Sequence, residues 1–134
     1  MDSLTELQRR ILAVLEEAGE DDVSALTNSV TKRRGSADEI DAMSMALVGL
    51  INCNLIDIAR SKDNVSLHWI PLPKEASLAL LTDLKPFFQW SVQDQLWKWR
   101  QDASRAEVVL TDAGLIAARK ILSEDDWPRA GLIQ

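Results

Sequence analysis

The stretch Ser36–Asn54, SADEIDAMSMALVGLINCN, decides the fold of this chain. It opens with Ser36 and places Glu39 three residues later, the spacing of a capping box, in which the serine oxygen accepts a backbone N–H and the glutamate reaches back. Apolar residues then recur at helical spacing and form one stripe: Ile40, Met43, Leu47, Leu50 and Ile51. We therefore predict a helix here, the third of a small helical core, against which the rest of the chain packs.

The opposite face of this predicted helix is also apolar beyond its acidic start at Asp38 and Asp41. Its outward positions contain no Arg, Lys or Gln and are Ala42, Met45, Val48 and Gly49. A helix that is apolar on both sides is normally covered on both sides. Two covers remain open: the segment Val65–Gln95 folds back over this face, or a second chain covers it across a two-fold axis that brings Met45 near its own copy.

Length and charge narrow the class of protein. A chain of 134 residues fits a single domain, 1–134, with a real hydrophobic core. The net charge of −6 argues against a nucleic-acid binder, which usually carries a basic patch. The single Cys53 excludes an internal disulfide and indicates a reducing compartment. MDSLTEL lacks the features of a signal peptide, and no apolar run is long enough to span a bilayer, so we predict a cytoplasmic protein without membrane contact.

Periodicity predicts the remaining elements. A first helix runs from Leu4 to about Ala18 behind a capping box of Ser3 and Glu6, and a second from about Val23 to Lys32. The predicted strands are Leu55–Arg60, Val65–Ile70, Leu96–Arg100 and Ala106–Leu110, the last two forming a hairpin. Further helices are predicted at Lys74–Leu84 and Asp112–Leu122, while 87–95 fits a helix and a strand equally well. The acidic tail 123–134 is expected to be loosely ordered.

The order of three helices, a hairpin and the return Val108–Gly114 (VVLTDAG) into a closing helix resembles the winged-helix superfamily, especially bacterial regulators of the MarR and PadR kind. Their wing returns through a similar Leu-Thr-x-x-Gly, and Asp102 and Arg105 are similar to the Asp-x-Arg of the MarR wing, with one more residue between them. The likeness implies an α+β winged helix with an insertion at about 65–95. Here Leu110 ends the strand, Thr111 caps the helix and Gly114 allows close packing.

The resemblance implies a DNA-contacting third helix and wing, but the residues match only in part. Arg105 corresponds to a wing arginine. The third helix lacks the Arg, Lys, Asn or Gln that read base edges, and phosphates would repel Asp38 and Asp41. We therefore expect any DNA contact to be weak and non-specific.

Residues for catalysis or for a cofactor are not apparent in the sequence. His68 is the only histidine and has no partner cluster nearby, so a metal or catalytic role is not indicated. The five glycines are scattered, so no phosphate-binding loop is present, and no nucleophile motif occurs. We expect a protein that is not an enzyme and uses no cofactor or metal.

Two functions remain open. The first is a regulatory module that acts by contact with another protein or by homodimerisation; its candidate contact residues are Ala42, Met45, Val48, Trp97 and Trp99. Cross-strand packing in the core is the competing explanation for the tryptophans. The second function is a DNA-binding transcriptional regulator that contacts phosphates through Lys32, Arg33, Arg34, Arg100 and Arg105. The missing base-reading side chains favour the first function.

Overall fold

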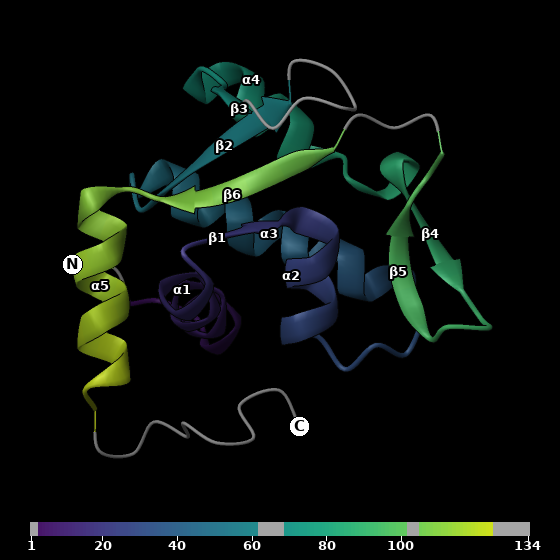
Figure 1. Ribbon diagram of the computed structural model, residues 1–134, viewed down its shortest axis with the longest axis horizontal. Helices are drawn as coiled ribbons and strands as arrows, with labels where there is room; N and C mark the ends of the chain where they lie inside the picture. The colour runs from purple at the N-terminus through teal and green to yellow at the C-terminus, as the bar shows by residue number, and fades with distance from the viewer. Residues whose placement is uncertain (1–2, 62–68, 102–104, 125–134) are drawn as a thin grey trace.

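The structure, a computed structural model, describes residues 3–61, 69–101 and 105–124. This part of the chain has an α+β fold with five α-helices and antiparallel sheets (Figure 1). The helices are α1 (Glu6–Ala18), α2 (Val23–Val30), α3 (Ala37–Asn52), α4 (Lys74–Thr82) and α5 (Asp112–Leu122), with a 3₁₀ turn η1 (Lys85–Phe87). The strands are β1 (Glu20–Asp22), β2 (Ile56–Ser61), β3 (Trp69–Pro71), β4 (Phe88–Ser91), β5 (Leu96–Trp99) and β6 (Ala106–Leu110).

Two antiparallel sheets organise these elements. The larger has the order β1-β6-β2-β3, and the smaller is the pair β4-β5. In Figure 1 the core helices α1, α2 and α3 lie below β2 and β6, and α5 and the β4–β5 hairpin stand at opposite ends. Helix α4 is at the top of this view and packs against α3. Ion pairs support the α5 end: Arg119 Nε lies 3.5 Å from Glu16 Oε1, and Arg9 pairs with Glu124. No helix in the described ranges is long and apolar enough to cross a membrane.

The helix predicted from Ser36–Asn54 is confirmed. Ser36 is its N-cap, and the serine oxygen accepts the N–H of Asp38 at 3.2 Å. The predicted stripe is buried throughout: Ile40, Met43, Leu47, Leu50 and Ile51. These side chains join residues from α1, α2 and the sheet in one core.

The first two helices differ from prediction at one end each. The capping box of α1 is formed by Thr5 and Gln8, each two residues later than the predicted Ser3 and Glu6. Thr5 Oγ1 accepts the N–H of Gln8 at 3.1 Å, and Gln8 Oε1 accepts that of Thr5 at 2.9 Å. The second helix ends at Val30 and not at Lys32, because Thr31 is extended and its hydroxyl bonds the carbonyl of Thr27 at 2.8 Å.

The predicted hairpin between Leu96–Arg100 and Ala106–Leu110 is not formed. Both segments are strands, but β5 pairs with β4, and β6 lies between β1 and β2. The ambiguous segment 87–95 contains strand β4, which gives β5 a partner only a four-residue turn away, and a short loop is cheap to close. Ring contacts support this pairing, with centroid distances of 4.6 Å for Phe88–Trp99 and 5.3 Å for Trp90–Trp97.

A long segment connects two neighbouring strands of the larger sheet. Residues 62–105 lie between β2 and β6, which pair directly with Ile58 opposite Val108. We call this segment the insertion, after the insertion predicted at about 65–95; it includes β3, α4, η1, β4 and β5. Its α4 packs against α3, and its β5 packs against α2. The predicted strand residues 65–68 and the tail beyond residue 124 lie outside the described residues.

The predicted junction into the last helix is confirmed. Thr111 caps α5, and its hydroxyl accepts the N–H of Gly114 at 3.0 Å and donates to the carbonyl of Asn54 at 2.7 Å. A Cβ on Gly114 would lie 1.8 Å from the carbonyl oxygen of Leu55. Glycine is therefore required there, because α5 begins directly against the chain that leaves α3.

We expect Leu47→Ala to lower the free energy of unfolding by roughly 2–5 kcal/mol, because Leu47 is fully buried and the change leaves a cavity. Ile116→Ala is the matched control: Ile116 on α5 is 71% exposed, and its loss should change stability by less than about 0.5 kcal/mol. Denaturant unfolding followed by circular dichroism measures both. Equal effects of the two changes would contradict the core assignment.

Candidate functional site

The outward side of α3 is open to solvent in the described structure. We define the α3 outer face as Ala42, Met45, Val48 and Gly49. Met45 is 76% exposed and Ala42 is exposed, whereas Val48 and Gly49 are half-buried. From Ala42 to Asn52 the helix carries no charged residue. A large apolar side chain therefore protrudes from an uncharged stretch of α3.

Of the two covers left open by the sequence, the segment Val65–Gln95 does not cover Met45, which is 76% exposed. The insertion packs against α3 on a different side, which carries Asp41: Lys85 Nζ lies 3.1 Å from Asp41 Oδ2. Helix α4 packs against α3, and its Leu80 and Leu81 are buried. Leu84, which directly precedes η1, is buried as well. This packing satisfies the insertion without enclosing Met45.

A hollow adjoins the α3 outer face at Ala42. It has a volume of about 330 Å³ and lies where α1, the end of α2 and the start of α3 meet. Its apolar lining comes from Leu7, Val30 and Ala42, and its polar lining from Thr31, Lys32, Arg34, Ser36, Asp38 and Glu39. We call it the α2–α3 hollow. Its lining is mainly apolar, and charges of both signs stand around it.

The other border of the face is formed by α1. Gln8 Nε2 donates to the carbonyl oxygen of Ala46 at 3.2 Å, and a Cβ on Gly49 would lie 2.5 Å from this same nitrogen. The missing side chain of Gly49 thus lets Gln8 lie across α3. The exposed part of the outer face is consequently narrow and centred on Met45 and Ala42.

Glu39 holds the turn that shapes the hollow. Its carboxylate accepts the backbone N–H of Arg34 and of Gly35, both at 3.0 Å, and the indole N–H of Trp97 at 3.2 Å. Burial acts to raise the pKa of Glu39, but these hydrogen bonds outweigh it, so the pKa lies below its ordinary value of 4.5. The capping box predicted a hydrogen bond from Glu39 back to the backbone of Ser36, and the carboxylate in addition binds the backbone of Arg34 and Gly35 in the turn before it.

The inserted hairpin is fastened to α2 by side chains that imitate a neighbouring strand. Asn28 Oδ1 accepts the N–H of Trp97 at 2.8 Å, and Asn28 Nδ2 donates to the carbonyl of Trp97 at 2.9 Å. The hydroxyl of Ser24 donates to the same carbonyl at 2.9 Å. The ring of Trp90 lies so close to Gly35 that a Cβ there would come within 2.7 Å of it. No sequence pattern indicated these contacts, because they join residues far apart in the chain.

The two predicted tryptophan contact residues serve the fold. Trp97 is only 7% exposed and belongs to the core. Trp99 is half-buried, stacks near Phe88 and donates its indole N–H to the carboxylate of Asp22 at 2.8 Å. Because both side chains take part in the packing of the hairpin, we base the candidate surface on the α3 outer face and the α2–α3 hollow.

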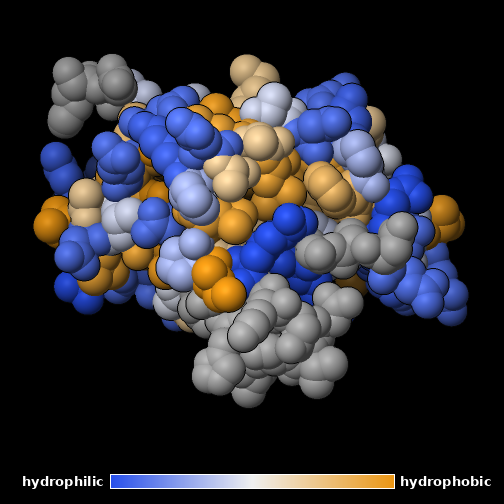
Figure 2. Space-filling view, turned by 90° about the horizontal axis from the view of Figure 1, so that it is seen from above, coloured by the Kyte–Doolittle hydropathy of each residue, from blue (hydrophilic) through white to orange (hydrophobic). Residues whose placement is uncertain are grey.

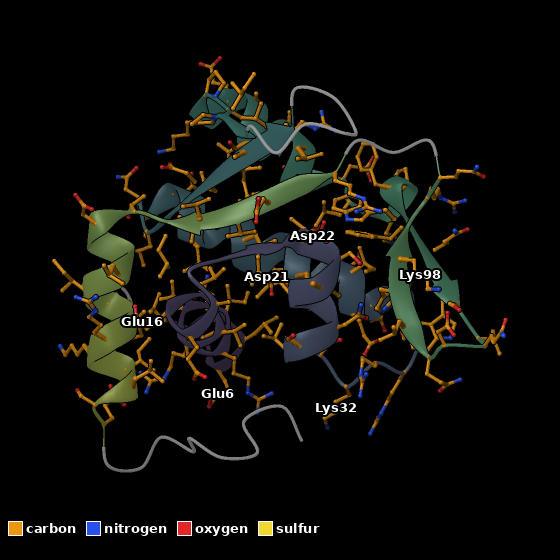
Figure 3. All side chains as sticks on the ribbon, viewed as in Figure 1. Glu6, Glu16, Asp21, Asp22, Lys32 and Lys98 are labelled. Atoms are coloured by element: carbon orange, nitrogen blue, oxygen red, sulfur yellow. The ribbon has the colours of Figure 1, made fainter. Side chains whose placement is uncertain are left out.

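The five predicted phosphate contacts are exposed but are not brought into one patch. Lys32 and Arg34 line the α2–α3 hollow, whereas Arg105 lines a second hollow beside Asp22 and Lys98. Arg100 lines a third, between the hairpin and the start of α3. Figure 3 shows Lys32 below α2 and Lys98 out on β5, well apart. Arg33 is exposed in the turn with a positive φ of 52°.

Other surfaces of the described chain offer less. Hydrophobic residues gather near the middle of the surface seen from above (Figure 2), and we assign this area no role. On β3, Ile70 is 49% exposed. Within the described ranges no three His, Cys, Asp or Glu side chains are grouped to hold a metal ion. Cys53 is exposed and unpaired by any disulfide, and His68 lies outside the described residues.

Comparison with known proteins identified no relative of this chain. No protein-family model matches the sequence, and neither a curated protein nor a solved structure is significantly similar to it. The functional argument therefore depends on the site.

We expect Glu39→Gln to lower the free energy of unfolding at pH 7 by about 1 kcal/mol, because a charged acceptor of several N–H groups is lost. Because the pKa of Glu39 is lower in the folded state, its ionised carboxylate stabilises the fold, and this stabilisation is fully present above pH 4.5. The stabilisation is lost as the pH falls through the lowered pKa of the folded state. The variant and the wild type should thus converge in stability as the pH falls from 4.5 through the lowered pKa of Glu39.

Thermal melts between pH 3 and pH 7 would measure this convergence. Asp38→Asn is the control, because Asp38 is an exposed acid of the same helical turn. If Glu39→Gln and wild type keep a constant difference over the whole range, the carboxylate does not act through its charge.

Proposed function

We propose that this protein is a non-enzymatic regulatory module of the winged-helix class that binds a protein chain with the α3 outer face and the α2–α3 hollow. The observation that carries the proposal is the 76% exposure of Met45 on an uncharged stretch of α3, next to a mainly apolar hollow of about 330 Å³. An exposed apolar residue beside an apolar depression is the arrangement of an interface anchor and its pocket.

The order and pairing of the elements support the winged-helix class. Helix α1, strand β1, helices α2 and α3, and strand β2 follow one another, and β6 then lies between β1 and β2 before the closing α5. In this interpretation β2 and β6 are the two strands of the wing, and residues 62–105 are inserted at its tip. The tight Thr111–Gly114 junction is the part that the resemblance to MarR and PadR regulators described best.

Charge and chemistry favour protein over DNA at this surface. Base edges are recognised by side chains that make paired hydrogen bonds, mainly Arg, Lys, Asn and Gln. The exposed centre of the face, Ala42 and Met45, offers none of these, and the exposed Asp38 stands at its start. An uncharged apolar anchor suits the desolvated centre of a protein interface.

DNA binding is the second candidate function, and one observation favours it. The insertion leaves the outer face of α3 open, and the exposed Lys32, Arg33 and Arg34 stand directly before that helix. Phosphate contacts from these three residues would be independent of sequence.

For the DNA candidate we expect a dissociation constant of about 10⁻⁴ to 10⁻⁶ M on mixed duplex DNA at physiological salt, since few cations converge on one surface. Fluorescence anisotropy in a salt series measures it, with Lys32→Gln/Arg34→Gln as the variant and Lys98→Gln as the matched control. A sub-micromolar, sequence-dependent affinity at that salt would place DNA ahead of protein.

For the protein candidate we expect a photoreactive benzophenone amino acid at position 45 to form a protein adduct in the cells from which the sequence derives. The same amino acid at position 116, equally exposed on α5, is the control and should form none. Denaturing electrophoresis and mass spectrometry report the partner. Adducts at both positions, at neither, or only with nucleic acid would overturn the proposal.

A further inference from the structure

The two strands of the smaller sheet treat their outer edges differently. Because β4 and β5 pair only with each other, each strand has one edge that faces away from the sheet. At the outer edge of β5, Asn28 takes both backbone groups of Trp97: it accepts the N–H at 2.8 Å and donates to the carbonyl at 2.9 Å. The backbone groups of Trp97 therefore point away from β4, and α2 closes this edge.

The outer edge of β4 has no such cover. Trp90 lies directly opposite Trp97, and opposite residues of an antiparallel pair either bond each other or both face away. Trp90 consequently directs its N–H and its carbonyl outward, and Phe88, two residues earlier, directs its carbonyl to the same edge. Within residues 3–61, 69–101 and 105–124 these three groups form no hydrogen bond. They are the groups with which a further strand could pair.

A hollow adjoins β4 at the start of α3. It has a volume of about 290 Å³, and its lining includes three consecutive residues of β4 together with Ala37 and Ile40 of α3. Lys85, Trp97 and Arg100 complete the lining, and we call this depression the β4 hollow. Since one water occupies about 30 Å³, the hollow has room for a side chain. In Figure 1 β4 lies on the side of the hairpin away from α2, so a further strand can approach it without displacing that helix.

The charge at the β4 hollow is positive. Its lining contains two basic residues, Lys85 and Arg100, and no acidic one. Lys85 Nζ already lies 3.1 Å from Asp41 Oδ2. Arg100 is exposed and forms no ion pair with any residue that the structure describes. An acidic side chain brought to this edge would therefore meet the guanidinium of Arg100.

We propose that the outer edge of β4 binds an extended, acidic peptide segment of a partner protein, which adds a third strand to the β4–β5 sheet. The unpaired backbone groups of Trp90 and Phe88 bond the main chain of this segment, and main-chain bonds of this kind supply affinity without regard to side chains. Specificity comes from side chains that alternate along the segment: an apolar one enters the β4 hollow, and an acidic one pairs with Arg100. The surface is separate from the α3 outer face, so this inference does not depend on the proposed function.

The first test selects ligands from a display library of random eight-residue peptides and follows backbone amide exchange by nuclear magnetic resonance. We expect the selected peptides to contain acidic and apolar residues. An added peptide should slow exchange of the Trp90 amide at least about tenfold, because that N–H gains a hydrogen bond. The amide of Gln89 is the internal control: this residue faces Lys98 in the neighbouring, bonded pair and should be protected with or without the peptide.

The second test reverses the charge at the hollow. Arg100→Glu should weaken binding of a selected acidic peptide at least about tenfold, because two like charges would then face each other. Lys98→Glu is the matched control: it changes the net charge equally at an exposed position of the same hairpin outside the β4 hollow, and it should weaken binding less than about twofold. A peptide with lysine in place of its acidic residue should prefer Arg100→Glu to the wild type. Fluorescence anisotropy measures binding, and circular dichroism shows that each variant is folded.

Peptides that bind without slowing the Trp90 amide overturn the strand addition, and so does a selection that yields no acidic peptide. Equal losses in Arg100→Glu and Lys98→Glu overturn the pairing with Arg100. A Trp90 amide that is already protected in the chain without peptide overturns the open edge, and its dependence on dilution shows whether a second copy covers it. The proposed function fails or holds separately, because the adduct at position 45 on α3 does not involve β4.

Discussion

The carboxylate of Glu39 is the interaction on which the remaining architecture depends. It accepts N–H groups from Arg34 and Gly35 in the turn between α2 and α3, and the indole N–H of Trp97 from the inserted hairpin. One charged group on α3 therefore fixes both the local turn and a segment nearly sixty residues further along the chain. Because hydrogen bonds to a charged acceptor are stronger than neutral ones, this group sets the position of the hairpin against α2 and α3.

The position of the β4–β5 hairpin explains why the candidate surface lies at Ala42 and Met45 on α3. Asn28 and Ser24 hold β5 by its backbone, and Trp90 closes over Gly35. Trp90 and Trp97 of the insertion pack at the turn between α2 and α3, and α4 packs against another side of α3. Ala42 and Met45 remain exposed. The functional proposals follow from this division: the insertion stabilises the helical core without closing the surface at which a second chain can bind.

Local sequence signals were sufficient where the relevant partners lie a few residues apart. The Ser36 cap, the buried stripe that includes Leu47, and the Thr111–Gly114 junction are all set by neighbours within one or two helical turns. The sequence also indicated Met45 as an outward residue of α3. It did not indicate the hollow beside Met45, because Leu7 and Val30 belong to other helices whose packing is not encoded in any short pattern.

The sequence by itself determined the α+β class, the succession of three core helices and the strand character of Leu96–Arg100 and Ala106–Leu110. Tertiary structure alone decided which strands pair, since alternating residues specify a strand but not its neighbour: β6 joined β1 and β2, and β5 joined β4. It also decided which apolar surfaces were buried. Trp97 and Met45 looked alike as exposed contact candidates, yet Trp97 has the partners Glu39 and Asn28 from distant segments, whereas Met45 has none in the described chain that cover it.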